Sequence, residues 1–252
     1  MRRCALPAPL DLEQIPLNDD AKRYLCGALR LREGDHFIGF DGEGHERVFE
    51  LARGGSADTL IAIGIGESYE GRGGAPIGLC FALPKGDKLD LVARQITELG
   101  ISSLYLWSAE RSVGVWKSSK VDTKLARLSR VVSEAARQSG RADQLKVFAP
   151  LSLREIIEQL DHIPIKLFLD PLATEGWPSR GMSSAASTSA RDDTPLKCVL
   201  VVGPEGGLSP SELTTLGDAG WRGVRLNSPI LRTETAGVVA CTIALDRLGY
   251  LA

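Results

Sequence analysis

The sequence predicts an α/β protein, and three features of the chain point to it. From about residue 77 onward, short apolar segments alternate with stretches whose apolar residues recur every three or four positions, as in alternating strands and amphipathic helices. Residues 198–202 are continuously apolar, which is typical of a strand buried on both faces of a parallel sheet. Before residue 70, short alternating segments between Gly- and Asp-containing turns predict a small β-barrel or sheet.

Each predicted element has a local reason. In the first part, alternation predicts strands at 36–40, 47–51 and 61–65. Later strands are predicted by apolar runs, and later helices by N-capping residues and glycine stops. We expect strands at 77–83, 104–107, 146–148, 166–169 and 198–202. We expect helices at 87–100, 118–139 and 152–159, and two more that begin after Ser209 and at about Thr233.

Two domains are expected, over residues 1–72 and 73–252. The segment 70–76 is rich in glycine and ends in proline, which makes it the best candidate for a linker. Residues 176–195 include a run of small polar residues and are expected to form a flexible surface insertion.

The net charge of −2 conceals an uneven distribution. Residues 1–70 carry 8 basic and 13 acidic side chains, residues 71–150 carry 13 and 7, and residues 151–252 carry 9 and 12. A basic middle segment can attract phosphate groups locally although the total charge is slightly negative.

Several classes of protein are disfavoured by the composition. No apolar run is long enough to span a membrane, and the N-terminus lacks the apolar segment of a signal peptide. The five cysteines and three histidines show no metal-ligand spacing, so no metal site is expected. Cys80, Cys198 and Cys241 lie in apolar runs, as expected of reduced core residues in a cytoplasmic protein.

The first motif that could bind a ligand or carry out chemistry follows the apolar run 198–202. Gly203-Pro204-Glu205-Gly206-Gly207 leads to Ser209, which is well suited to cap a helix that starts with Pro210 and has Glu212 at its third position. The carboxyl end of a parallel strand is where α/β folds usually bind ligands. A tight connection is the structural alternative, but such a turn does not need the carboxylate of Glu205.

The second motif is the entrance to the last predicted helix. Arg232 and Glu234 lie where a loop after Leu226 meets a helix of small and apolar residues. An arginine at a helix N-terminus beside a glycine-rich loop is suited to anionic or carbonyl oxygens. The alternative is a cap with a surface charge.

The third motif is a basic stripe on the helix predicted at 118–139. Arg127, Arg130, Arg137 and Arg141 recur with near-helical spacing, and three lysines lie at its start, at positions 117, 120 and 124. Only Asp122 and Glu134 offset these seven cations within the segment, so a phosphate-binding track is favoured over a solvated face.

Eight segments match one known family in order along nearly the whole chain: 29–35, 40–44, 85–87, 98–100, 110–112, 134–141, 203–207 and 230–236. In these segments the chain resembles the RsmE-type methyltransferases of the SPOUT superfamily. The resemblance implies an N-terminal PUA-like β-barrel, then an α/β trefoil-knot domain that forms a homodimer. It also implies methylation of uridine N3 in 16S ribosomal RNA of the small subunit, with S-adenosyl-L-methionine as donor.

The resemblance also implies roles for particular residues. Arg232 would stabilise charge on the uracil, and Glu234 would orient Arg232 or take part in proton removal. The cofactor-binding residues would be Leu169, Gly203, Pro204, Glu205, Gly206, Leu226, Ser228, Leu231 and Thr235. The residues that contact RNA would be Arg30, Arg111, Arg137 and Arg141.

The chain departs from the family pattern at three positions, which leaves alternatives open. Tyr24 stands where the family usually has a histidine, and Asn227 and Pro229 lie where it has Leu-Gly-x-Arg. Alternatives are a knotted methyltransferase for another RNA or for a ribose 2′-OH, and an RNA-binding assembly factor with weak or lost methylation. A metabolite-binding α/β protein without an RNA partner is a further alternative.

Overall fold

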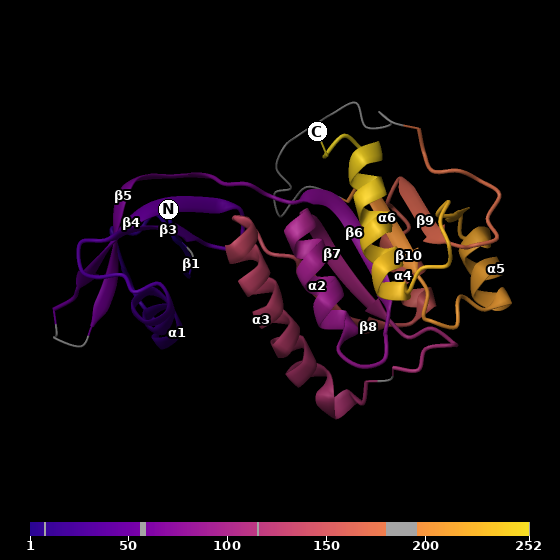
Figure 1. Cartoon of the computed structure of the whole chain (residues 1–252), viewed down its shortest axis with the longest axis horizontal. Coiled ribbons are helices and arrows are strands. Elements are labelled where there is room, and N and C mark those ends of the chain that lie inside the picture. The colour runs from indigo at the N-terminus through magenta and orange to yellow at the C-terminus, as the bar shows by residue number, and fades with distance from the viewer. Residues whose placement is uncertain (8, 56–58, 115, 180–195, 252) are drawn as a thin grey trace. The chain divides into compact units, whose positions relative to one another are not determined.

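The structure of the chain is a computed structural model, and it describes residues 1–7, 9–55, 59–114, 116–179 and 196–251. The chain forms two compact units. The first consists of residues 1–73 with 136–144, and the second of residues 74–135 with 145–252. Figure 1 labels most of the helices and strands of both.

The first unit contains a five-stranded sheet in the order β1-β3-β4-β5-β2. β1 pairs with β3 in parallel and the other pairs are antiparallel. The three strands expected from alternation are confirmed as β3, β4 and β5. The bounds are β1 Arg3–Ala5, β2 Gln14–Pro16, β3 His36–Phe40, β4 His45–Arg53 and β5 Leu60–Glu70.

A helical segment in the first unit corrects the expectation of strands and turns alone. The short helix α1 (Asp19–Lys22) continues into a π-helical turn, η1 (Arg23–Ala28). The side chain of Asn18 caps α1 by accepting a hydrogen bond from the Ala21 amide at 2.8 Å. Leu25 of η1 is fully buried in the core of this unit with Phe37 and Phe49.

The second unit contains a six-stranded sheet in the order β11-β9-β10-β6-β7-β8, and all of its pairs are parallel. The prediction of a parallel α/β sheet is therefore confirmed. The bounds are β6 Ala75–Ala82, β7 Ile101–Trp107, β8 Lys146–Leu151, β9 Ile165–Leu169, β10 Cys198–Val202 and β11 Arg222–Val224.

Helices cover both faces of this sheet because its strands are apolar on both sides. Ile77, Leu79 and Phe81 of β6 share one core with residues of α2 (Lys88–Leu99), α3 (Val121–Ser139) and α6 (Thr233–Arg247). Cys80 and Ala82, which alternate with them, face a second core that includes α4 (Leu153–Leu160) and α5 (Pro210–Asp218). Figure 1 shows α2 and α6 over one face of the sheet.

The capping signals set several helix ends, although Asp87, the expected cap of α2, makes no side-chain capping hydrogen bond among the described residues. Ser152 and Ser209 form complete capping boxes with Glu155 and Glu212, and Pro210 opens α5. Gly100 ends α2 with φ of 88°, a left-handed conformation that favours glycine. The 3₁₀ turn η2 (Ser118–Lys120) precedes α3.

The predicted insertion falls largely on residues 180–195, which lie outside the described residues. Trp177, at its start, donates a hydrogen bond from its indole Nε1 to the Arg225 carbonyl at 3.0 Å. Cys80, Cys198 and Cys241 are buried, as predicted, and burial raises the pKa of Cys198 to about 12. Within the described ranges, no helix has the length and apolarity to cross a membrane, and no cluster of acidic, His and Cys side chains could hold a metal ion.

Candidate ligand-binding site

A cavity of about 640 Å³ lies at the carboxyl ends of β9 and β10 in the second unit. It is built from the ends of these strands, the glycine-rich loop after β10, and the loop that enters α6. Six of the predicted site residues line it together: Leu169, Gly203, Pro204, Glu205, Leu231 and Arg232. The sequence motifs before α5 and α6 therefore meet at one place, although 27 positions separate Glu205 from Arg232.

The glycine-rich loop is shaped by close packing. A Cβ at Gly203 would lie 3.1 Å from side-chain atoms of Leu208, tighter than most such contacts. Gly207 has φ of 71°, and its amide donates to the Pro204 carbonyl at 2.9 Å, which closes a turn. The buried hydroxyl of Thr233 donates to the Gly203 carbonyl at 2.7 Å and so ties the start of α6 to this loop.

Arg111 holds the far side of the same loop. Its Nη1 donates to the Gly206 carbonyl at 3.2 Å and to the Leu208 carbonyl at 3.3 Å. The next residue along the chain, Glu110, accepts a hydrogen bond from Ser211 at 2.7 Å. The structure thus places Arg111, which the resemblance implies as an RNA contact, in the support of the cavity loop.

Lys88 is a site residue that the sequence analysis does not include. Its Nζ lies 2.9 Å from Glu205 Oε1 and 3.3 Å from Glu234 Oε2. Hydrogen bonds to Glu205 and Glu234 raise the pKa of Lys88, although desolvation opposes them. Burial acts to raise the pKa of Glu205, but the hydrogen bond and charge of Lys88, together with backbone hydrogen bonds from Glu205 and Lys85, hold that pKa below its ordinary value.

One signal in the sequence could have identified Lys88. It is the first residue of α2, directly after the N-cap Asp87. A cation there is unfavourable because the N-terminus of a helix carries partial positive charge. A lysine at this position therefore indicates an anionic partner elsewhere in the fold.

Arg232 and Glu234 occupy the first turn of α6 in different environments. Arg232 is the N-cap residue, is exposed and lines the cavity. Among the described residues, none accepts a hydrogen bond from its guanidinium or forms an ion pair with it. The side chain of Glu234 is only 12% exposed and pairs with Lys88. The cavity is thus lined by the Arg232 guanidinium, which is unpaired among the described residues, and the nearby carboxylate of Glu234 is paired with Lys88.

Five of the predicted catalytic and cofactor-binding residues do not line this cavity. Glu234 joins it only through Lys88, and Gly206 lies against Arg111, where an added Cβ would be 3.2 Å from the Arg111 Cβ. Leu226 lines a second cavity of about 450 Å³ with Trp177 and Asn227. The Ser228 hydroxyl donates to the Pro229 carbonyl at 3.0 Å, and Thr235 is exposed on α6.

The predicted basic stripe is interrupted in the structure. Arg127 pairs with Asp90 at 2.6 Å and Asp87 at 3.2 Å, two carboxylates from outside the helix that the local charge count omits. The Lys124 Nζ lies 4.7 Å from the centre of the Trp116 ring. Arg130 is exposed on α3.

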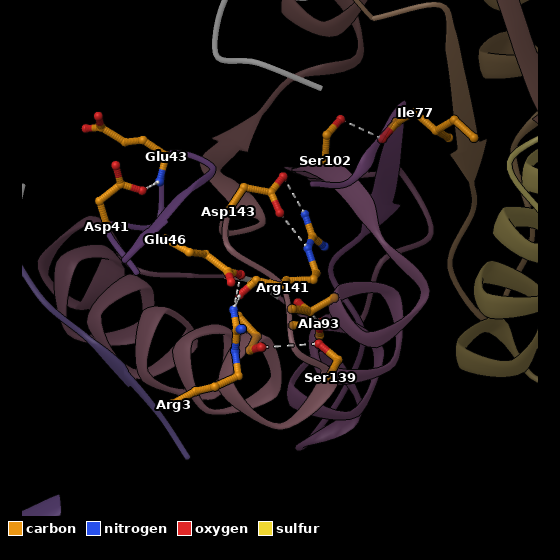
Figure 2. Close-up of polar contacts among 12 residues, drawn as sticks. Arg3, Asp41, Glu43, Glu46, Ile77, Ala93, Ser102, Ser139, Arg141 and Asp143 are labelled. Carbon is orange, nitrogen blue, oxygen red and sulfur yellow. Dashed lines mark hydrogen bonds and ion pairs between the residues drawn. The ribbon is translucent and has the colours of Figure 1, made fainter. Parts of the chain in front are cut away.

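Arg141 also differs from its predicted place. α3 ends at Ser139, so Arg141 is not on the helix. It is only 3% exposed, and its Nε and Nη2 donate to the two carboxylate oxygens of Asp143 at 2.9 and 3.0 Å, as Figure 2 shows. Figure 2 also shows Arg3, which donates to Glu46 and to the Arg141 carbonyl. This burial and the pairing with Asp143 correct the prediction that Arg141 is presented to RNA, because its guanidinium is enclosed in the first unit.

Arg30 and Arg137 belong to the first unit and remain accessible. Arg30 is exposed with φ of 54°, and Arg137 is half-buried with its Cζ 4.6 Å from the centre of the Tyr24 ring. Neither guanidinium forms an ion pair with a described residue, so both are available for the predicted contact with RNA.

The fold and the cavity define a class: an α/β protein with a ligand site formed by loops at the carboxyl edge of a parallel sheet. Comparison with known proteins gives the family. The RNA methyltransferase domain model matches residues 73–245, and the chain belongs to this family.

Named relatives are similar over long stretches. The chain is 30% identical over 235 residues to the ribosomal RNA small subunit methyltransferase E of Bacillus subtilis, covering 91% of this chain and 90% of the relative. It is 37% identical over 169 residues to the protein of the same name in Mycobacterium tuberculosis, covering 66% of this chain. The matched region spans 61% of that mycobacterial relative's length.

A solved structure is similar over almost the full chain. It is a ribosomal RNA small subunit methyltransferase E from Neisseria gonorrhoeae bound to S-adenosyl methionine, with a TM-score of 0.76 and 26% identity. The similarity covers 97% of each chain.

Proposed function

We propose that this chain transfers a methyl group from S-adenosyl-L-methionine to N3 of a uridine in 16S ribosomal RNA of the small subunit. The observation that carries the proposal is the cavity in which Gly203, Glu205 and Arg232 meet at the carboxyl edge of the parallel sheet. Membership of the RNA methyltransferase family and the names of the relatives support the reaction and the RNA.

The residues present fit the proposed cofactor. A volume of about 640 Å³ is in the range of small-molecule sites. Apolar side chains of Leu169, Leu208 and Leu231 suit a nucleoside, and the backbone of the loop from Gly203 to Gly207 supplies polar groups at its edge. S-adenosyl methionine is bound in the similar Neisseria gonorrhoeae structure, which supports this assignment.

The bound cofactor would supply an electrophilic methyl group on its sulfonium. In the transfer, the N3–methyl bond forms as the sulfur–methyl bond breaks, and the N3 proton leaves to a base. Arg232 is exposed at the cavity and has unused donors, so it can stabilise the charge that spreads onto the uracil oxygens. Glu234 orients Arg232 or takes part in proton removal, and Lys88 pairs with its carboxylate at 3.3 Å.

The RNA would be bound in part by the first unit, through Arg30 and Arg137. Its five-stranded sheet supports the expected PUA-like barrel, and the parallel sheet of the second unit supports the expected trefoil knot. We further infer a homodimer, supported by Leu172 and Ile230, apolar residues that line the cavity although 86% and 92% exposed. The reduced core cysteines and the ribosomal substrate support a cytoplasmic location.

The test is methylation of small subunits isolated from a strain that lacks this chain. With labelled S-adenosyl methionine, we expect label in 16S ribosomal RNA, and a rate of labelling about a hundredfold or more lower when the Arg232→Ala variant replaces the wild type. Calorimetry with S-adenosyl methionine is the companion measurement. Absence of both binding and label would overturn the proposal in favour of a non-catalytic RNA-binding protein.

A further inference from the structure

We propose that Tyr24 and Arg137 form a stacking site for one unpaired nucleobase of the RNA substrate. The inference rests on the proposed function for the identity of the ligand as RNA. It goes further by assigning Arg137 to a base rather than to a phosphate, and by giving Tyr24 a role in binding.

The Arg137 guanidinium lies over the Tyr24 ring, as in a cation–π pair. The Arg137 Cζ lies 4.6 Å from the centre of the Tyr24 ring. Tyr24 is partly buried and packs against the core of the first unit, which fixes the position of its ring. The guanidinium of arginine is planar, and nucleobases stack on guanidinium planes as they do on aromatic rings.

The polar groups of Arg137 are also available. Among the described residues, none accepts a hydrogen bond from its guanidinium and none forms an ion pair with it. Arg141, four positions further on, is buried and pairs with Asp143 through its Nε and Nη2. Arg137 is thus the arginine of this segment whose donors can still reach a ligand.

The position of Arg137 on its helix favours a neutral ligand. It lies in the last turn of α3, which ends at Ser139 and is followed by Gly140 with φ of 77°. The carbonyl end of a helix carries partial negative charge, which already attracts the guanidinium and repels a phosphate. A nucleobase has no net charge, and its carbonyl and ring-nitrogen acceptors match the donors of arginine.

The turn that holds Tyr24 brings a second cation to the same region. Tyr24 lies in the π-helical turn η1, where its carbonyl accepts from the Leu29 amide at 2.9 Å. Arg30 follows, with the one positive φ, 54°, among the non-glycine residues that the structure describes. π-helical turns and left-handed non-glycine residues are often found at functional sites. Arg30 is exposed and follows this turn directly, so its charge is close in the chain to the proposed base site.

The test compares two probes of equal length and charge at low salt: an oligouridylate and an abasic ribose–phosphate oligomer. Arg137→Lys keeps the charge but removes the planar group. We expect about tenfold weaker binding of the oligouridylate, since a stacked base contributes about a factor of ten or more to affinity. Binding of the abasic oligomer should be unchanged. Tyr24→Leu should behave like Arg137→Lys, and Tyr24→Phe should bind like the wild type.

Arg130→Lys is the matched control, because Arg130 is on the same helix and makes no ring contact among the described residues. It should bind both probes like the wild type. Equal losses of affinity for both probes would assign Arg137 to phosphate and overturn the stacking site. Failure of the oligouridylate to bind the wild-type protein at low salt would also overturn it. Methylation of small subunits by the wild-type protein tests the proposed function separately, so the two failures are distinguishable.

Discussion

The ammonium of Lys88 lies 2.9 Å from Glu205 Oε1, which links the first turn of α2 to the glycine-rich loop after β10. Because the same ammonium lies 3.3 Å from Glu234 Oε2, it also links both elements to the start of α6. Three segments far apart in the sequence are thus joined at the wall of the cavity by one side chain.

Lys88→Met should destabilise the protein in a pH-dependent way. The pKa of Glu205 is lowered in the folded state, so its contribution to stability is present above its unfolded pKa of about 4.3 and is lost as pH falls through the lower, folded value. The pKa of Lys88 is raised, so its contribution is present below about 10.4 and is lost at higher pH.

Urea unfolding at a series of pH values measures this effect. The difference between wild type and Lys88→Met should be largest near neutral pH and shrink in acid and in strong base. Lys85→Met is the matched control, since Lys85 is an exposed lysine in the preceding loop. A difference that does not change between pH of about 3 and 7 would contradict a role for the Glu205 pair.

Arg232→Ala should reduce the rate of methyl transfer by about a hundredfold to a thousandfold, the usual effect of removing one donor to a developing charge. The affinity for S-adenosyl methionine should stay close to that of the wild type, because Arg232 is proposed to act on the uracil. Arg225→Ala, at an exposed position in the same unit, should retain full activity. Near-normal turnover by Arg232→Ala with unchanged cofactor binding would remove Arg232 from the mechanism.

Arg111→Ala should weaken cofactor binding by about 1–2 kcal/mol, the contribution expected of charge-assisted hydrogen bonds at a partly exposed site. The reason is that the Gly206 and Leu208 carbonyls lose their common donor and the loop loses its shape. Calorimetry measures the cofactor and filter binding measures the RNA. A loss of RNA affinity with normal cofactor affinity would instead identify Arg111 as an RNA contact.

Arg141→Met should lower the free energy of unfolding of the first unit by about 3 kcal/mol, because it leaves the buried Asp143 carboxylate without its cation. Arg130→Met, at an exposed position, should change stability by less than about 0.5 kcal/mol. Thermal unfolding followed by circular dichroism compares the two. Equal stabilities would show that Arg141 has no structural role.

The elements with local signals could be predicted from the sequence. Ser209, Pro210 and Glu212 specify the start of α5 by their own hydrogen bonds and backbone preferences, and the structure has that start. β10 follows from five consecutive apolar residues. The meeting of the motifs at Glu205 and Arg232 follows from strand direction, since carboxyl ends of parallel strands lie at one edge.

The remainder depends on contacts that no local pattern contains. The partners of Arg127 are Asp87 and Asp90, from a different helix and its cap, so a charge count along α3 misses them. The π-helical turn η1 could not be predicted, because no hydrophobic periodicity marks it in the sequence. The pattern also does not reveal that residues 136–144 join the first unit, because a continuous helix carries the chain there.

The measurement that tests the central claim most directly is mass mapping of 16S ribosomal RNA after reaction with this protein. Small subunits from a strain lacking the chain are incubated with the wild-type protein and S-adenosyl methionine, and digested fragments are compared with untreated ones. The account predicts one added methyl group on the base of a single uridine, at N3. A methyl group on a ribose 2′-OH, or on a nucleotide other than uridine, would contradict it.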